Sequence, residues 1–333
     1  MRVQLATKLL VRVSTLALFP AHVAPPSQYR SGVHFTTGIR TAQVTMGASD
    51  STLSTSDAGA ADDGAIVQNI HRFAVKGLGR DELPSVTLQS GGGLPHDREW
   101  ALIFSEQRAS FDDAAPEWLH KSNFLCAFTA NELVAQFRTA FDAATRALSV
   151  WRRSDGAALL AGARLDAPDG RAEVAAFFSN ASGRAVEVVS ARARPHAFGN
   201  TASGWKDSGD TRVVHLVNVN TVAAVAAASG TPLDAGRFRA NVILGGTLPA
   251  WREFEWVGRT ISVGGAVLKV VKRTVRCEGV NVDPRGSGRA DLDVPALLQK
   301  HFPQHGPFLG VYAQVVSAGE VKVGDRVRVR PAG

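Results

Sequence analysis

Short apolar segments separated by turn residues dominate the first half of the chain and predict a β-rich structure. Two arms, 132–141 and 147–152, flank the turn residues 142–145 and predict a hairpin, with a helix as the rival for the first arm. Further strands are predicted over 66–75, 83–88 and 100–104, and shorter apolar segments follow over 156–190. We expect this half to be a β-rich barrel or sandwich.

The second half of the chain continues the short-strand pattern and adds two helices. Gly264 and Gly265 separate two apolar runs, which predicts a second hairpin. Asp293 and Pro295 are typical of the first residues of a helix, and Asn220 can cap another one. The predicted strands are 215–219, 238–244, 254–263, 266–277, 311–316, 321–323 and 326–330. The predicted fold class is therefore α+β, mainly β, with a few short helices.

Residues 1–49 differ in composition from the rest, because they contain five basic residues and no acidic residue. Ser, Thr, Ala and Val are frequent, and leucines recur at helical spacing, which is typical of an organelle transit peptide. We expect a mitochondrial or plastid location, and a cytosolic one if the segment is not a targeting signal. A secretory signal and a disordered tail are the alternatives. Arg12 and Pro20 interrupt the apolar run, which is too short for a transmembrane span, and residues 50–64 form a flexible linker.

The net charge of +7 suggests a nucleic-acid partner, but the distribution of the charge argues against one. Residues 1–49 contain five of the 37 Lys and Arg residues, so the other 32 face 30 acidic residues, a net charge of +2. Two cysteines cannot supply a disulfide framework, a four-cysteine zinc site or an iron–sulfur cluster. Cys126 lies in an apolar run and is expected to be a packed core residue.

Cys277 lies where a predicted strand opens into a loop of turn residues. Arg276 is its neighbour, and Lys272 and Arg273 come just before. Fixed positive charge favours the thiolate, which is the form of cysteine that binds metals and attacks electrophiles. From the residues alone, a buried structural cysteine is the other interpretation, and both interpretations stay open.

Five segments, in the same order, resemble proteins that contain a MOSC domain, the fold named after the C-terminal part of molybdenum cofactor sulfurase. Cys277 stands at the family's cysteine, and Ala240 replaces the proline of its Arg-Phe-Arg-Pro-Asn segment. The similar segments are 237–242, 276–284 and 319–329 in the MOSC domain, and 73–76 and 97–100 in the N-terminal β-barrel domain of amidoxime-reductase-like proteins.

The resemblance implies an N-terminal MOSC-associated β-barrel domain over 65–190 and a MOSC domain over 191–331. It also implies a bound molybdenum cofactor, a pterin dithiolene with a phosphate, whose metal is held by Cys277 as the catalytic residue. A soft thiolate suits such a metal, and cationic side chains suit the phosphate. By motif position the implied cofactor contacts are Lys76, Arg98, Arg239 and Arg276, with Asn241 as a polar group that fixes the loop. Pyridoxal phosphate binding is a further association at the level of the family.

The function that the resemblance implies is a molybdenum oxidoreductase that reduces N-hydroxylated small molecules. Its electrons would come from external donors, by analogy a haem protein of the cytochrome b5 type and its flavin reductase. Two alternatives stay open, namely a carrier of persulfide sulfur or of the cofactor, and a binding module without catalysis. Residues 247–249 lack the acid that animal amidoxime reductases tend to have there, so the substrate is in question.

Overall fold

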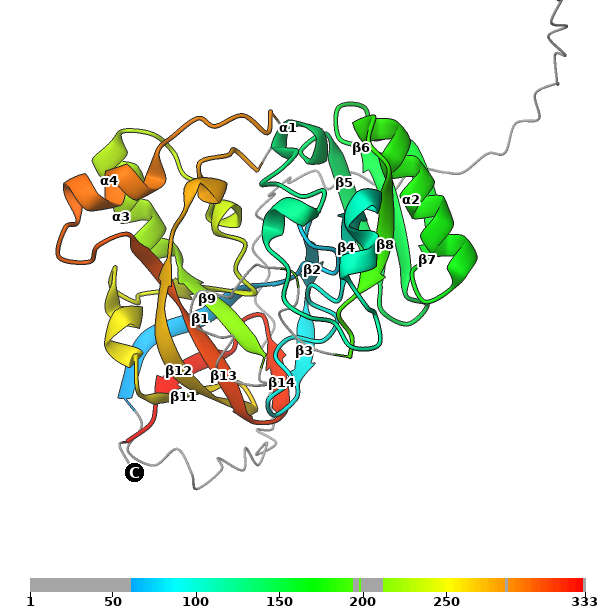
Figure 1. Ribbon diagram of the computed structural model, residues 1–333. Helices are drawn as coiled ribbons and strands as arrows, with labels where there is room; N and C mark the ends of the chain where they lie inside the picture. The colour runs from blue at the N-terminus through cyan, green and yellow to red at the C-terminus, as the bar shows by residue number, and fades with distance from the viewer. Residues whose placement is uncertain (1–60, 194–197, 199–211, 285–286, 332–333) are drawn as a thin grey trace, which may run out of the picture. The chain divides into compact units, whose positions relative to one another are not determined.

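The computed structural model describes residues 61–193, 198, 212–284 and 287–331. The predicted transit peptide and most of the predicted linker lie outside these residues, so the targeting prediction stays a prediction. Strands outnumber helices in the described part of the chain, and the helices are short or of moderate length (Figure 1). The predicted fold class, α+β and mainly β, is therefore confirmed.

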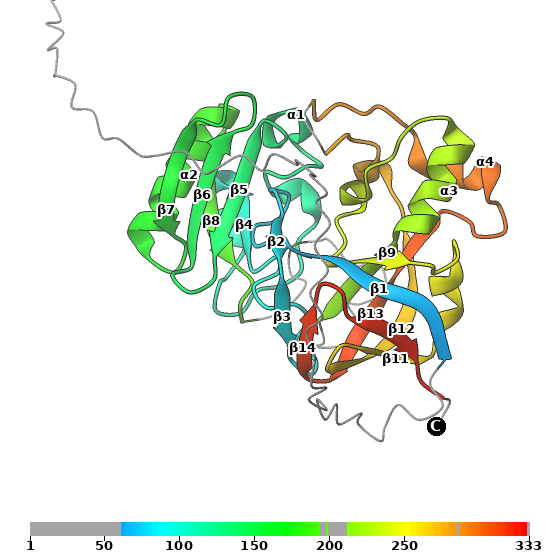
Figure 2. The same ribbon diagram turned by 180° about the vertical axis from the view of Figure 1, so that it is seen from behind.

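A closed barrel of seven strands organises the second half of the chain. The strands of the barrel are β1 (Ala61–Arg72), β9 (Val213–Asn218), β10 (Val242–Gly246), β11 (Thr260–Val263), β12 (Ala266–Val275), β13 (Phe308–Ser317) and β15 (Arg326–Val329), and β2 (Asp81–Leu83) is an eighth strand of the same sheet outside the closed ring. Their order is β10, β9, β13, β12, β11, β15, β1, and β1 pairs back to β10, with β2 added beside β1. All neighbours are antiparallel except β9 and β10. Figure 2 shows β1 running along the barrel.

The barrel closes because alternate side chains of its strands meet in one hydrophobic core. Along β12, Ala266, Leu268 and Val270 are buried, and the residues between them are more exposed. These side chains pack with others such as Val67, Leu216, Leu244, Val311 and Val327. Full burial of one such side chain contributes about 1.5–3 kcal/mol, so the shared core is what holds strands from both ends of the chain together.

The strand β1 belongs to the barrel rather than to the predicted N-terminal domain that begins at residue 65. It begins at Ala61, inside the predicted linker, and pairs with β10 and β15. These partners lie far away in the sequence, so a local pattern cannot reveal the pairing. The family of the region before residue 190, and the boundary there, stay predictions.

Residues between β2 and β9 build a second hydrophobic core. The strands here are β3 (Ser85–Leu88), β4 (Trp100–Phe104), β5 (Phe137–Asp142), β6 (Ala147–Arg152), β7 (Ala158–Arg164) and β8 (Val186–Ser190). β4 pairs with β8, β5 to β7 form a three-stranded sheet, and β3 pairs with β14 (Gly319–Lys322) near the end of the chain. The helix α2 (Pro168–Ser182) packs on β7 and β8 (Figure 1) and buries Val174 and Phe178 against this core.

The helix α2 replaces the series of short apolar segments predicted over 156–190. The dipeptides at 169–170 and 182–183 look like turns in the sequence, but they lie at the two ends of the helix. Pro168 occupies the first turn, where proline is favoured, and Gly183 ends the helix with a φ of 67°. A Cβ on Gly170 would clash with the backbone of β7, so a glycine here permits close packing rather than a turn.

Short helices cover one end of the barrel and support the site. They are α3 (Val219–Ser229), α4 (Val294–His301) and the 3-10 helices η4 (Ala235–Phe238), η5 (Arg252–Trp256) and η6 (Glu278–Val280), while α1 (Asn131–Val134), η2 (Ser105–Ser110) and η3 (Lys121–Asn123) belong to the N-terminal region. Asp293 caps α4 as predicted, because its side chain accepts a hydrogen bond from the Ala296 amide at 3.0 Å. Asn218, rather than the predicted Asn220, caps α3.

Candidate functional site

Cys277 lies just after β12 and immediately before η6. Its side chain is exposed to solvent, whereas Cys126 is buried. The interpretation of Cys277 as a buried structural cysteine is therefore wrong, and the core position of Cys126 is confirmed. An exposed thiol on a short turn is free to bind a metal or to react with an electrophile.

Arg276 is buried, and its guanidinium makes four hydrogen bonds inside the fold. Nε donates to the Leu309 carbonyl at 2.8 Å, and Nη2 donates to the same oxygen and lies 2.8 Å from His215 Nε2. Nη1 donates to the Phe238 carbonyl at 3.5 Å. Burial lowers the pKa of Arg276 to about 10, so the group stays charged at neutral pH. These partners favour a positioning role for Arg276 over the direct cofactor contact that the resemblance implies.

His215, which is buried, and Tyr312, which is half-buried, lie next to Arg276, although the sequence patterns do not single them out. Their ring centroids are 5.0 Å apart. Burial and the charges of Arg276 and Arg98 hold the pKa of His215 well below its usual value, so the neutral ring can accept a hydrogen bond from Arg276. Burial raises the pKa of Tyr312, which also lies in the fields of Arg276, Arg98 and Cys277. The sequence offers one indication of these contacts, namely that His215 interrupts the apolar run of β9.

Lys76, Arg98 and Arg239 form a cationic cluster. Lys76 Nζ lies 6.0 Å from the centroid of the Phe124 ring, and the two arginines lie against the buried ring of Phe73. The guanidinium carbons of Arg98 and Arg239 lie 4.8 and 4.2 Å from the ring centroid, within the range of cation–π attraction. Arg98 Nη2 donates to the Arg239 carbonyl at 3.0 Å. Both arginines have a positive φ, 50° and 52°, which is a costly conformation that the surroundings must enforce.

The cationic cluster holds more positive charge than nearby acids neutralise. Burial, with help from Arg98 and Arg239, lowers the pKa of Lys76 to about 8, and burial and Arg98 lower the pKa of Arg239 to about 9. Asp97 pairs with Arg98, but within the described ranges neither Lys76 nor Arg239 forms an ion pair. Arg239 Nη2 is buried without a hydrogen-bond partner. Leaving a buried donor unpaired costs about 1–3 kcal/mol, which a bound oxyanion would recover.

Asn241 lies between η4 and β10, and its side chain is held by hydrogen bonds to two strands. Its side-chain Oδ1 accepts from the His215 amide at 3.1 Å, and its Nδ2 donates to the His71 carbonyl at 3.3 Å. The side chain is buried, and these two bonds connect β9 to β1 two residues after Arg239, which caps the C-terminus of η4. Both polar atoms of the Asn241 side chain are used in these hydrogen bonds, so Asn241 positions the backbone next to Arg239 rather than binding a ligand.

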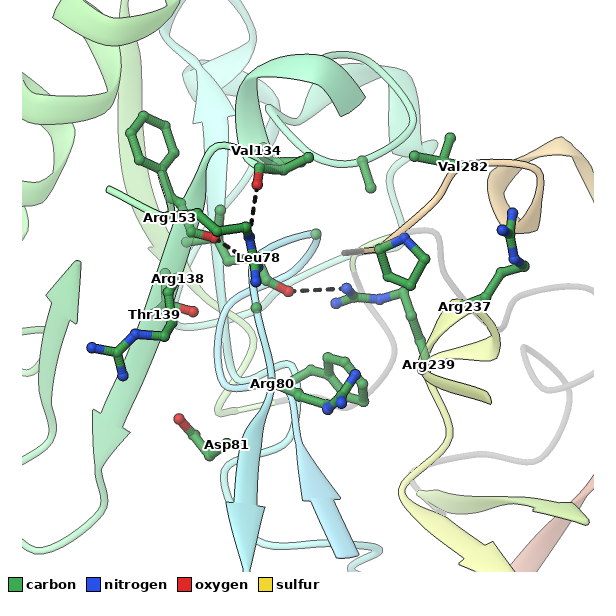
Figure 3. Close-up of a pocket in the computed structure, with 18 of the residues that line it drawn as sticks. Leu78, Arg80, Asp81, Val134, Arg138, Thr139, Arg153, Arg237, Arg239 and Val282 are labelled. Atoms are coloured by element: carbon green, nitrogen blue, oxygen red, sulfur yellow. Dashed lines mark hydrogen bonds between the residues drawn. The ribbon is translucent and has the colours of Figure 1, made fainter. Parts of the chain in front are cut away.

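A cleft with a volume of about 700 Å³ adjoins the cationic cluster. Figure 3 shows Arg153 on one side of it, Arg237, Arg239 and Val282 on the other, and Arg80 lower down between the two sides. Arg239 Nη1 donates to the Leu78 carbonyl at 2.9 Å and so links the two sides. Gly279 also lines the cleft, and a Cβ on it would lie 3.7 Å from Cys277 Sγ. The cleft therefore extends from the cationic cluster to the turn that carries Cys277.

Residues 247–249, where an acid is absent, are not among the described residues that line this cleft. Asn218 Nδ2 donates to the Pro249 carbonyl at 2.8 Å, and Asn220 Nδ2 donates to the Leu248 carbonyl at 2.7 Å. This segment is thus fixed against the first turn of α3. The absence of an acid in residues 247–249 therefore affects the packing against α3 and not the wall of the cleft.

Glu253 is a fully buried carboxyl group behind the same segment. Thr221 Oγ1 donates to it at 2.9 Å, and Asn218 Nδ2 donates to it at 3.1 Å. Burial raises the pKa of Glu253 to about 7, while both hydrogen bonds act in the opposite direction. The carboxyl group is therefore about half protonated at neutral pH in the folded protein and ionised in the unfolded chain.

Replacing Glu253 by Gln is expected to reduce the pH dependence of stability. Because folding raises the pKa of this acid from 4.5, its contribution to stability is full below about pH 4.5 and is lost as pH rises through about 7. The loss amounts to about 3 kcal/mol, since each pKa unit corresponds to about 1.4 kcal/mol. Urea unfolding at pH 5 and pH 8 measures it. Equal pH slopes for wild type and Glu253→Gln would contradict this assignment.

Among the residues that the structure describes, no group of three or more His, Cys, Asp or Glu side chains could hold a metal ion. No helix in the described ranges has the length and apolar character needed to span a bilayer.

Comparisons with known proteins bear on the second half of the chain. The model of the MOSC domain family matches residues 196–328. The solved structure of the YuaD protein from Bacillus subtilis is similar over 82% of this chain and 100% of that chain, with 12% identity and a TM-score of 0.36. YiiM from Geobacillus stearothermophilus is similar over 36% of this chain and 55% of that chain, with 18% identity and a TM-score of 0.27. No curated protein matches the chain.

The family match agrees with the motifs found in the sequence, since the segments 237–242 and 276–284 lie within the matched residues and 319–329 overlaps their end. A MOSC domain implies a function connected with binding or sulfuration of the molybdenum cofactor. The comparisons therefore show similarity to the MOSC domain family over residues 196–328 of this chain.

Proposed function

We propose that this chain is a molybdenum-cofactor-dependent oxidoreductase that reduces N-hydroxylated small molecules. The observation that carries the proposal is an exposed cysteine thiol, Cys277, at the edge of a cleft that adjoins a partly unneutralised cationic cluster. A thiolate and a set of buried cations are what a dithiolene-bound metal and a phosphate require from a protein. The family match points to the same cofactor.

The residues present fit such a cofactor. Arg239 Nη2, buried and unpaired, and Lys76, buried without an ion pair in the described ranges, would hold the phosphate together with Arg98. Cys277 would hold the metal. The cofactor, when bound, supplies a metal that can accept and deliver electron pairs.

The other residues of the site keep these groups in place. Arg276 forms hydrogen bonds to His215 on β9 and Leu309 on β13, and these bonds fix the position of the residue next to Cys277. Asn241 fixes the backbone beside Arg239. Lys76, with its pKa of about 8, is mostly protonated at pH 7 and so presents a positive charge to a bound anion. Electrons would come from an external donor, by analogy with a haem protein of the cytochrome b5 type and its flavin reductase.

The exposure of Cys277 also supports a second candidate function, a carrier of sulfur or of the cofactor. In that case the thiol would carry a persulfide, and the protein would pass on the sulfur or the cofactor without redox turnover. A solvent-accessible thiolate is a requirement of both functions, so the position of Cys277 does not separate them.

Elemental analysis of the purified protein for molybdenum and pterin tests cofactor binding directly. Reduction of benzamidoxime by the loaded protein, with electrons from a viologen dye, then separates the two functions. Turnover supports the reductase. A loaded protein without turnover, whose Cys277 labels as a persulfide after treatment with a sulfur donor, would instead support the carrier.

Replacing Lys76 by Met is expected to weaken retention of the cofactor by roughly tenfold to a hundredfold. A charge-assisted hydrogen bond contributes about 1.5–3 kcal/mol, and each 1.4 kcal/mol is a factor of ten in affinity. Activity per bound molybdenum should fall less than total activity. Lys322→Met is the control, because Lys322 is exposed and pairs with Glu320. Equal retention in both variants would remove Lys76 from the site.

A further inference from the structure

Arg153 projects into the cleft from the end of the β5–β6 hairpin, on the side opposite the MOSC residues (Figure 3). Its Nε donates to the Ala135 carbonyl at 3.0 Å, and its Nη2 donates to the Phe137 carbonyl at 3.2 Å. These two bonds fix the plane of the guanidinium. In the described part of the chain Nη1 has no hydrogen bond and Arg153 has no ion pair, so part of this fixed group is available to a ligand.

Arg80 also lines the cleft (Figure 3), and its ion pair with Glu82 is weak. Its Nε and Nη2 both lie 3.4 Å from Glu82 Oε1, which is long for a hydrogen bond, and the Glu82 side chain is 65% exposed. Exposed pairs of this kind contribute little. The guanidinium abuts the backbone of η4, because a Cβ on Gly236 would collide with Arg80 Nη1. Arg80 therefore holds its charge within the cleft.

The arginines in this part of the cleft repel one another. Partial burial lowers the pKa of Arg153, and the charges of Arg80 and Arg138 lower it further, while Asp283 acts in the opposite direction. Fixed arginines with unused donors and like-charged neighbours are the arrangement that a bound oxyanion stabilises, and the planar guanidinium suits carboxylate and phosphate oxygens. This part of the cleft thus has the chemistry of an anion subsite.

The position of this subsite suits a group of the substrate rather than the phosphate of the cofactor. The cationic cluster already provides three cations for the cofactor's phosphate, and Arg239 faces Arg153 across the cleft (Figure 3). Gly279 and Val282, on the turn that follows Cys277, line the same space. A small molecule anchored at Arg153 would therefore have its other end directed toward the turn that carries Cys277.

We propose that Arg153 and Arg80 form an anion subsite that selects N-hydroxylated substrates carrying a carboxylate or phosphate group at the end remote from the N–O bond. The substrate class rests on the proposed reductase function, whereas the anion subsite itself rests on the geometry of the two arginines. The two parts can be tested separately.

The first test compares benzamidoxime with 4-carboxybenzamidoxime in steady-state kinetics of the full chain loaded with cofactor. Wild type should favour the carboxylate compound. Arg153→Gln should raise its KM by roughly tenfold to a hundredfold and leave KM for benzamidoxime unchanged. Arg152→Gln is the matched control, because Arg152 is the adjacent residue, is exposed as Arg153 is, pairs with Asp155 at 2.8 Å and is not among the described residues that line the cleft. Equal preference in wild type and Arg153→Gln overturns the proposal.

The second test measures binding by calorimetry and needs no turnover. 4-Carboxybenzamidoxime and phenyl phosphate are titrated into wild type, Arg153→Gln and Arg152→Gln, and the stronger of the two identifies the preferred oxyanion. Loss of binding only in Arg153→Gln supports the subsite even if no N-hydroxylated compound is reduced, in which case the proposed function alone has failed. Equal binding in all three proteins overturns the subsite. A fall in molybdenum content of Arg153→Gln also overturns it, since the arginine would then serve the cofactor.

Discussion

Replacing Cys277 by Ser is expected to abolish molybdenum retention and to change the free energy of unfolding by less than about 0.5 kcal/mol. Serine keeps the size of the side chain but replaces a soft thiolate by a hydroxyl that does not ionise at neutral pH, so the metal loses its protein ligand. Cys277 is exposed, and exposed positions without special contacts contribute little to stability. Elemental analysis and urea unfolding of the purified variant measure the two quantities.

The matched control is Cys126→Ser, which changes the same atom at the other cysteine. Cys126 is buried, and its Sγ lies 3.8 Å from the Lys121 carbonyl, which is too far for a serine hydroxyl to form a good hydrogen bond without movement. The variant should keep its molybdenum and lose about 1–3 kcal/mol of stability, since a buried hydroxyl without a partner costs that much. If Cys126→Ser lost the metal and Cys277→Ser retained it, Cys126 rather than Cys277 would be the metal ligand.

The sequence predicts those elements whose cause is local. The bounds of β4 and β6 agree with the prediction, as do the hairpin at Gly264 and the cap at Asp293, because alternation, turn residues and capping side chains act within a few positions. Pairing across the chain has no local signal. The place of β1 between β10 and β15 therefore appears only in the structure.

Two local predictions fail for a tertiary reason. The segment 254–263 has apolar residues at strand spacing, yet η5 occupies its first part and β11 begins only at Thr260. Trp251 adopts a φ of 68°, which turns the chain and buries Glu253 against α3. In α2, Gly170 indicates a turn by composition, but the close approach of β7 is what requires it. In both places a contact with a distant segment determines the conformation.

The site is predictable in part, and the missing part follows from strand alternation. Along β12, Ala266, Leu268 and Val270 are buried. A register shift between Val270 and Lys272 interrupts this alternation, which resumes at Thr274 and Arg276 and places Cys277 on the outer side. The same rule would have indicated that Arg276 is an internal group rather than a ligand contact. The cleft itself has no sequence signal, because Arg153 and Gly279 lie on segments that meet only in the folded chain.

The buried arginine Arg237 supports the loop that follows Cys277, and its partner is Asp291. The Arg237 side chain is fully buried, and its Nη1 and Nη2 donate to the two Asp291 carboxylate oxygens at 2.7 and 2.8 Å. Nη1 also donates to the Val280 carbonyl of η6 at 3.0 Å. The pair therefore connects η4, which leads into the cationic cluster, to both ends of the loop 280–291.

Replacing Asp291 by Ala is expected to destabilise the protein by about 3 kcal/mol and to reduce molybdenum retention as well. Removing one partner of a buried ion pair costs about 3–5 kcal/mol, because the other charge stays buried and uncompensated. The lower end applies here, since the Asp291 side chain is 37% exposed and water can reach the vacated position. Urea unfolding measures the stability. Asp155→Ala is the control, because it breaks the exposed Arg152 pair and should cost less than about 1 kcal/mol. A similar small cost in both variants would show that Arg237 finds other partners and that the Cys277 loop does not depend on this ion pair.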